Sequence, residues 1–261
     1  MALPPPVRRF CYAAWALDPG ARRTPWGMVT ANDRFPLIWD ANNACVLEDD
    51  PGLTPETIRE ALHPSLVAAG VAFEHIEFWE ASGQIPALRE LRLAGRAHDP
   101  DLVMLLEGNP TVSDAPSRIE VREVRHPVEP FWPWYRKSLR EFGGDPPEEV
   151  LDQMTERART VFHPAGLRWF LGLADDQEAG YTSVLSLGGV GYLDNVVTMP
   201  RFRRRGVASA TVARAVRSCL EQGDSAVFLL TDKGGGARRL YERLGFRARA
   251  EVETFHRPLS R

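Results

Sequence analysis

The most chemically distinctive stretch of the sequence combines arginines with a glycine and small residues. Its members are Arg201, Arg203, Arg204 and Arg205, followed by Gly206, Val207, Ala208 and Ser209. Guanidinium groups this close repel one another unless an anion or water lies between them. Gly206 has no Cβ, so the backbone there can approach a ligand closely. A helix that begins at this point has unpaired N–H groups, so we predict an anion-binding cradle that suits a pyrophosphate better than one carboxylate.

The residues on either side of the cradle are predicted to form a strand and an amphipathic helix. Residues 195–198 are expected to be a strand that stops at Met199 and Pro200. Apolar residues recur at helical spacing over 207–222, and Gly223 is expected to end that helix. An apolar strand over 226–230, a glycine-rich corner and a second helix over 237–244 should follow.

Two motifs in this part of the chain resemble landmarks of the GNAT acyltransferase family. The pattern Arg203-x-x-Gly206-x-Ala208, placed after a strand, resembles the loop that binds the pyrophosphate of acetyl-CoA. The string A-x-x-L-Y-x-x-x-G-F, from Ala237 to Phe246, is similar to the second landmark and lies at the expected distance. The resemblance implies an N-acetyltransferase that binds acetyl-CoA and transfers its acetyl group to an amine.

The resemblance also implies roles for particular residues. It assigns cofactor binding to Val196, Val197, Thr198, Arg203, Arg204, Arg205, Gly206, Val207, Ala208 and Ser209. Tyr241 matches the family tyrosine that acts as a general acid toward the leaving CoA thiolate. None of the cysteines is close to either motif in the sequence, so direct attack by the acceptor amine is favoured over a covalent enzyme intermediate.

The general base is left open between two alternatives. Asp194 is one candidate, because strict alternation along the strand would place it on one face with Tyr192, Val196 and Thr198. A water relay from a backbone carbonyl is the other. Tyr192 stands where some family members have a glutamate, and Gly234 stands where many have an asparagine.

The order of elements predicts an α/β fold with a mixed sheet, built as two tandem GNAT-like domains over residues 1–112 and 113–261. The order strand, helix, strand, helix, strand occurs over residues 35–107, starting with a strand expected at 35–39, and again over 192–255. The first copy has Glu48, Asp49 and Asp50 where the second has arginines, so we expect it not to bind CoA there. The boundary is expected within the turn-rich residues 108–117.

The composition of the chain argues against binding to nucleic acid or membranes. The chain has 261 residues, 44% of them hydrophobic, and a formal charge of −3, so its overall charge does not attract nucleic acid or an anionic membrane. The arginine cluster could also be a solvated turn or a weak nucleic-acid patch. The scattered cysteines, the lack of a membrane-spanning apolar run and the absence of a secretory signal favour a cytoplasmic protein, as monomer or homodimer.

The sequence identifies the molecule that accepts the acetyl group less precisely than it identifies the cofactor. The aromatic residues 131–135 form either part of the core or the wall of an acceptor pocket. A small amine or an amino-acid-like molecule is favoured over a protein or peptide terminus, and a non-catalytic acyl-CoA sensor remains a rival. His126, His163 and His256 are isolated and are interpreted as structural, and no motif predicts a metal site.

Overall fold

The computed structural model describes residues 2–81, 84–95, 100–108, 119–141 and 146–259. Their contacts group into two compact units. The first unit comprises Met1–Met104, Thr231–Arg238 and Ala248–Arg261, and the second comprises Leu105–Leu230 and Arg239–Arg247. The end of the chain therefore belongs to the same unit as its beginning. The boundary that the sequence predicts between residues 112 and 113 lies outside the described residues.

The first unit is a mixed sheet with helices packed on it. Its elements are α1 (Pro5–Trp15), β1 (Arg22–Thr24), β2 (Gly27–Thr30), the short 3-10 helix η1 (Trp39–Ala41), β3 (Asn43–Val46), α2 (Pro55–Ala68), β4 (Phe73–Phe78) and α3 (Pro86–Leu93), with β5 (Asp101–Leu106) beginning in this unit. The strand order is β1-β2-β3-β4-β11, and only β3 and β4 run parallel among these pairs. The last strand of the chain, β11 (Phe246–Pro258), joins this sheet by pairing antiparallel with β4.

Period-two alternation along β4 separates the two faces of this sheet. Ile76 and Phe78 belong to the apolar cluster formed with Ile58 and Leu62 of α2 and with α3. His75 and Glu77 alternate with them and therefore point to the opposite face, although both are buried. Polar side chains are thus enclosed on the second face of β4.

The strand expected at residues 35–39 is wrong. The chain makes successive turns there, with the Ile38 N–H donating to the Phe35 carbonyl, and it enters η1 at Trp39. The buried side chain of Asn42 donates to the carbonyls of Phe35 and Ile38 at 2.7 and 2.9 Å, so it satisfies backbone acceptors that a strand partner would otherwise take. The local apolar pattern could not reveal that competition.

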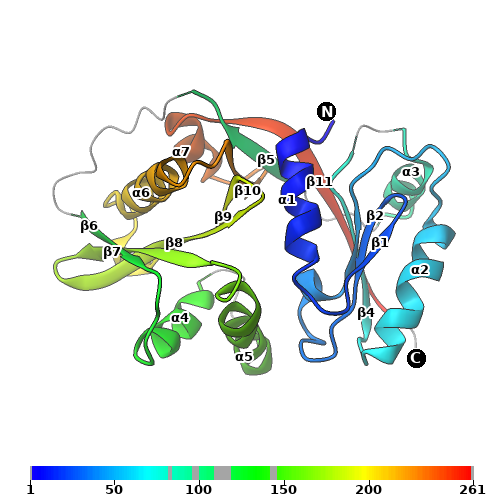
Figure 1. Cartoon of the computed structure of the whole chain (residues 1–261), viewed down its shortest axis with the longest axis horizontal. Coiled ribbons are helices and arrows are strands. Elements are labelled where there is room, and N and C mark those ends of the chain that lie inside the picture. Colours follow the sequence, from blue (N-terminus) through cyan, green and yellow to red (C-terminus); the bar gives the residue numbers. More distant parts are fainter. Residues whose placement is uncertain (1, 82–83, 96–99, 109–118, 142–145, 260–261) are drawn as a thin grey trace. The chain divides into compact units, whose positions relative to one another are not determined.

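The second unit is also a sheet flanked by helices (Figure 1). Its elements are β6 (Ile119–Val124), α4 (Phe131–Leu139), α5 (Glu148–Arg157), the π-helical turn η2 (Ala158–Phe162), β7 (Arg168–Ala174), β8 (Gln177–Leu187), β9 (Val190–Thr198), the 3-10 helix η3 (Pro200–Phe202), α6 (Val207–Glu221), β10 (Ala226–Asp232) and α7 (Arg238–Arg243). The strand order is β10-β9-β8-β7-β6, with β9 and β10 parallel and the other pairs antiparallel. Helix α6 covers one face of this sheet, and α4 and α5 cover the other (Figure 1).

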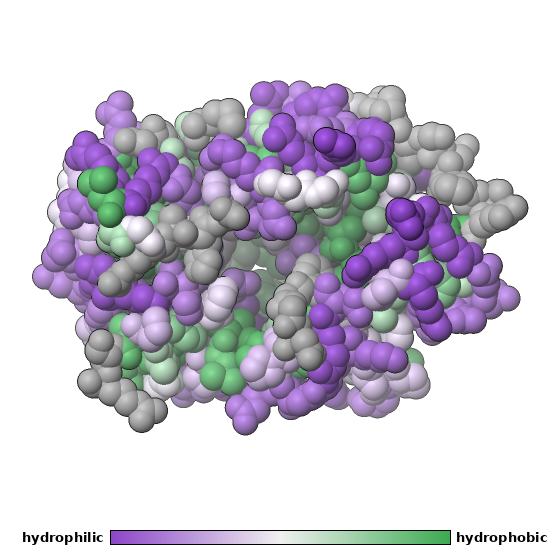
Figure 2. Space-filling model, turned by 180° about the vertical axis from the view of Figure 1, so that it is seen from behind, coloured by the Kyte–Doolittle hydropathy of each residue, from purple (hydrophilic) through white to green (hydrophobic). Residues whose placement is uncertain are grey.

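The repeated order of elements predicted from the sequence is confirmed. The first series is β3, α2, β4, α3 and β5, and the second is β9, α6, β10, α7 and β11. Among the described residues, no helix has the length and apolar character needed to cross a membrane. On the face seen in Figure 2 most residues are hydrophilic and the apolar ones form small separate patches, as expected for a protein surface in water.

Candidate active site

The start of α6 has the backbone geometry of an anion-binding site. Gly206 occupies the N-cap position with φ +86°, and Arg204 two residues earlier has φ +61°. Left-handed residues that alternate with other conformations before a helix turn neighbouring N–H groups toward one concave surface. Within the described residues no side chain caps this helix start, so its first N–H groups are directed at whatever binds there.

The arginines of the cradle are exposed and are held by weak contacts. Arg203 contacts the Thr198 carbonyl through Nε at 3.3 Å and Glu141 through Nη2 at 3.2 Å, while Arg205 pairs with Asp175 at 2.7 Å. Exposed ion pairs of this kind contribute little to stability, so a phosphate group can replace the carboxylates. Phe202 is buried beneath the cradle and positions the loop.

A β-bulge interrupts β9 just before the cradle. Val196 pairs with Thr182 and Leu193 with Val184, so Asp194 and Asn195 of β9 lie opposite the single residue Ser183 of β8. At the bulge the N–H of Asn195 donates to the Ser183 hydroxyl at 3.0 Å.

The bulge corrects the predicted alternation along this strand. In the observed register Tyr192 shares a face with Val197, whereas Val196 and Thr198 share the opposite face with Leu193. The prediction that Tyr192, Asp194, Val196 and Thr198 share one face is therefore wrong, because the extra residue reverses the order of faces beyond it.

Asp194 lies within the bulge and is exposed. Its carboxylate accepts a hydrogen bond from the side chain of Asn195. Burial raises the pKa of Tyr135 and Tyr181 well above the ordinary value, and the charge of Asp194 raises both pKa values further. Asp194 therefore lies close enough to Tyr135 and Tyr181 for its charge to affect their pKa values, on the side of the sheet covered by α4.

Tyr241 lies on α7, in the same unit as the cradle. The side chain is 6% exposed, and its ring packs edge-to-face against Phe246 at a centroid distance of 6.2 Å. The motif that contains these residues therefore has a packing function. Its role as a general acid stays a prediction. Gly234 lies in the exposed corner before α7.

The aromatic residues of α4 divide between the two interpretations left open by the sequence. Trp132 and Tyr135 are core residues, since both are buried and both pack against Trp169. Trp134 instead lines a pocket of about 350 Å³. The other residues that line it are Lys137, Glu178, Met199, Pro200 and Arg201.

This pocket adjoins the end of β9 and the first residue of the arginine cluster, and it contains residues that the sequence did not single out. Lys137 and Glu178 are exposed and come from α4 and β8, which are separate in the sequence. Neither belongs to a motif, so pairing of β8 with β9 is what brings Glu178 beside the cradle.

The corresponding turn of the first unit is built differently. Glu48 is paired with Arg8 at 3.2 Å and accepts a hydrogen bond from the Tyr12 hydroxyl at 2.9 Å. Carboxylates at this turn place negative charge where the second unit has arginines. Our expectation that this turn does not bind CoA stays a prediction.

Comparison with known proteins agrees with this fold. Residues 128–246 match the family model described as Acetyltransferase (GNAT) family. The resemblance to the GNAT acyltransferases that the sequence motifs indicate is therefore confirmed over this region, which contains the cradle and α7. A search of curated protein sequences gives no match.

Solved structures show the same fold over nearly the whole chain. A GCN5-related N-acetyltransferase from Kribbella flavida is 16% identical, with 97% of this chain and 95% of that one covered and a TM-score of 0.69. A functionally unknown conserved protein from Staphylococcus epidermidis is 11% identical, with 90% and 92% covered and a TM-score of 0.70. A tandem GNAT protein from the clavulanic acid biosynthesis pathway is 15% identical, with 94% and 85% covered and a TM-score of 0.59. The predicted fold class, an α/β tandem GNAT fold, is confirmed.

Proposed function

We propose that this protein transfers the acetyl group of acetyl-CoA directly to the amine of a small, amino-acid-like molecule. The observation that carries the proposal is the uncapped start of α6, where Arg204 and Gly206 hold left-handed backbone conformations beside exposed arginines. Such a site binds a pyrophosphate through N–H groups and guanidinium groups together. The family match supplies the chemistry that follows binding.

The state of the cysteines supports direct transfer over a covalent acetyl-enzyme. All three cysteines are buried. Burial raises the pKa of the Cys219 thiol to about 12, and it raises the pKa of Cys11 and of Cys45 as well. The nucleophilic form of cysteine is the thiolate, so none of these thiols is prepared to accept the acetyl group.

The pocket beside the cradle supports a small acceptor. A volume of about 350 Å³ is at the lower end of the range for small-molecule sites. Glu178 and the ring of Trp134 can attract an ammonium group, and Lys137 can pair with a carboxylate, so the pocket fits a zwitterion. Asp194, or a water molecule held by a backbone carbonyl, would then remove the proton that makes the amine nucleophilic.

The proposal is tested with the purified full chain. Calorimetry with CoA measures cofactor binding, and release of the CoA thiol from acetyl-CoA is measured across amines, amino acids and short peptides. We expect CoA binding and thiol release with a small amine or amino acid.

Several outcomes would contradict parts of this proposal. Absence of CoA binding would refute the cradle, and binding without thiol release would indicate a sensor. Thiol release with peptides alone would contradict a small acceptor. A stable acetyl group on the enzyme after incubation without acceptor, seen by intact-mass analysis, would contradict direct transfer.

The pocket assignment has its own test. Glu178→Gln should raise the KM for the acceptor roughly tenfold, by weakening a charge-assisted contact, while the KM for acetyl-CoA changes little. Glu149→Gln on the exposed start of α5 is the matched control. A change confined to the KM for acetyl-CoA would assign the pocket to the cofactor instead.

A further inference from the structure

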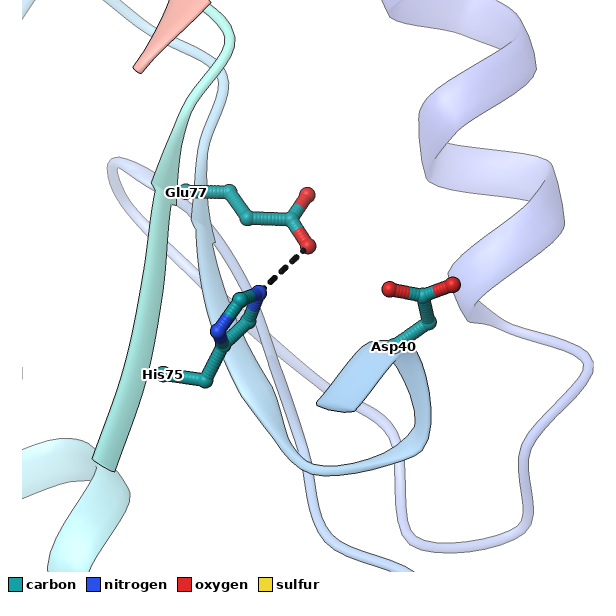
Figure 3. Close-up of side chains that lie close together, drawn as sticks. All are labelled: Asp40, His75 and Glu77. Atoms are coloured by element: carbon teal, nitrogen blue, oxygen red, sulfur yellow. Dashed lines mark hydrogen bonds and ion pairs between the residues drawn. The ribbon is translucent and has the colours of Figure 1, made fainter. Parts of the chain in front are cut away.

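The first unit encloses a group of ionisable side chains that acetyl transfer does not use. Asp40 lies on η1, and His75 and Glu77 lie two residues apart on the same face of β4. We propose that Asp40, His75 and Glu77 bind one divalent transition-metal ion of the Zn²⁺ class. Their ligand atoms all lie within 4.8 Å of one another, and the three side chains converge on one region of space (Figure 3).

Glu77 is held in a single orientation by several donors. It is 7% exposed, its Oε1 accepts a hydrogen bond from the Asn43 side chain at 3.1 Å, and Nε2 of His75 lies 3.1 Å from the same oxygen. Its Oε2 accepts from the indole of Trp79 at 2.6 Å. These contacts fix the direction of the Glu77 carboxylate. A buried carboxylate fixed by hydrogen bonds is typical of a metal ligand, because its outer partners set its direction.

His75 presents one ring nitrogen to Glu77 and the other to a second histidine. Its Nε2 lies 3.1 Å from Oε1 of Glu77, close to the separation of about 3.4 Å between ligands of a tetrahedral zinc ion. Its Nδ1 lies 3.4 Å from Nδ1 of His256. In the metal-bound form Nε2 of His75 coordinates the ion with its lone pair, and the ring proton is on Nδ1, where it is donated to His256.

The surroundings of His75 fix the plane of its ring. Trp39 stacks on His75 with centroids 5.4 Å apart and also contacts His256 at 4.3 Å. Trp39 is the neighbour of Asp40 on η1, so the same turn supplies the third ligand and the aromatic support. Rigid ligands on a strand with a second layer of supporting side chains lower the cost of organising a site when the ion binds.

Asp40 gives the site its opening to solvent. Its side chain is exposed, whereas His75 is 3% exposed, so an ion would enter from the side of η1. Rotation of the Asp40 side chain can shorten the remaining distance to the two buried ligands. Water would occupy the rest of the coordination sphere, and one imidazole with two carboxylates suits Zn²⁺ or Mn²⁺ better than the thiolate-preferring Cu⁺.

The experiment uses the full-length protein after treatment with a chelator and removal of that chelator. Co²⁺ is titrated while its visible absorption bands are recorded, and Zn²⁺ affinity is measured by competition with a chromophoric chelator. We expect one ion per chain with a Kd below about 10 μM, corresponding to about 7 kcal/mol of binding free energy. Failure of the unaltered protein to bind either ion in a one-to-one ratio would refute the site.

Variants locate the ion. Asp40→Asn changes an exposed side chain and should weaken binding at least tenfold, as removal of a metal-site partner usually does. Asp33→Asn, an exposed carboxylate of the same unit, is the control and should bind like the unaltered chain. His75→Gln should abolish binding, but because it alters the buried face, the decision rests on Asp40→Asn if His75→Gln fails to fold. Equal affinity of Asp40→Asn and the unaltered protein would overturn the proposal, since the ion would then lie elsewhere.

Discussion

The guanidinium of Arg203 donates a hydrogen bond from Nε to the Thr198 carbonyl at 3.3 Å. This contact links the cradle to the last residue of β9, so the loop and the strand are positioned together. The family resemblance assigns cofactor binding to Val196, Val197 and Thr198 of this strand. A single arginine can thus contribute both to phosphate binding and to alignment of the thioester.

Replacing Arg203 or Arg205 with alanine should raise the KM for acetyl-CoA roughly tenfold each, since a hydrogen bond to a charged group contributes about 1.5–3 kcal/mol and both groups are exposed. The KM for the acceptor should change much less. Initial-rate kinetics with both substrates varied provide the measurement. Arg122→Ala, in an exposed pair with Glu120 on β6, is the control. An unaltered KM for acetyl-CoA in both variants would count against the cradle.

Gly206→Ala tests the backbone of the same site. At φ +86° a Cβ is disfavoured, so we expect a loss of about 1–2 kcal/mol in the free energy of unfolding and weaker CoA binding. Urea unfolding and calorimetry measure the two effects. Gly52→Ala serves for comparison, because an added Cβ there meets only Asp50 at an ordinary contact distance of 3.4 Å. Full stability and CoA affinity in Gly206→Ala would show that the left-handed conformation is not needed.

Tyr241→Phe separates packing from catalysis. The phenylalanine ring keeps the contact with Phe246, so stability should be preserved. If the hydroxyl protonates the leaving thiolate, kcat should fall by roughly 10²-fold or more while the affinity for CoA stays constant. Tyr12→Phe, which removes a hydroxyl hydrogen-bonded to Glu48 in the first unit, is the matched control. Unchanged kcat would remove Tyr241 from the mechanism.

The elements around the cradle could be predicted because their signals are local. Apolar spacing, Gly223 after the helix and the stop at Pro200 all act within a few residues, and α6 begins and ends within one residue of the expected bounds. The turn at Phe35 could not be predicted in this way, because the side chain of Asn42 satisfies its carbonyls. Local apolarity cannot show which donor a carbonyl finds.

Features that depend on pairing between distant segments were beyond the sequence pattern. The bulge at Asp194 requires the register of β8 against β9, and the placement of β11 beside β4 requires contacts between residues far apart in the chain. The approach of Asp40 to His75 and Glu77 is of the same kind, since no short motif contains all three. Site residues on one continuous motif are therefore predictable, while those assembled by the sheet are not.

Asp101 gives a prediction about pH. Burial, followed by the charge of Asp232 and a hydrogen bond with it, raises the pKa of Asp101 from the ordinary 3.8 to about 6. The folded state then binds more protons than the unfolded state between about pH 4 and 6, so this residue contributes stability at low pH that is lost as the pH rises through that window. Asp101→Asn should remove this loss of stability with rising pH. The free energy of unfolding of the variant, relative to that of the unaltered chain, should therefore be higher at pH 7 than at pH 4.

Urea unfolding in the presence of a chelator, at pH values across this window, measures the difference between the two proteins. Asp232→Asn offers a second test, because removal of the neighbouring carboxylate leaves burial as the main cause and should bring the pKa of Asp101 back toward 3.8. The pH dependence of stability should then be weaker in Asp232→Asn than in the unaltered chain. The contrary result would be a difference in the free energy of unfolding between Asp101→Asn and the unaltered chain that is the same at pH 4 and at pH 7. Asp101 would then take up no proton in this range, and both carboxylates would be charged throughout.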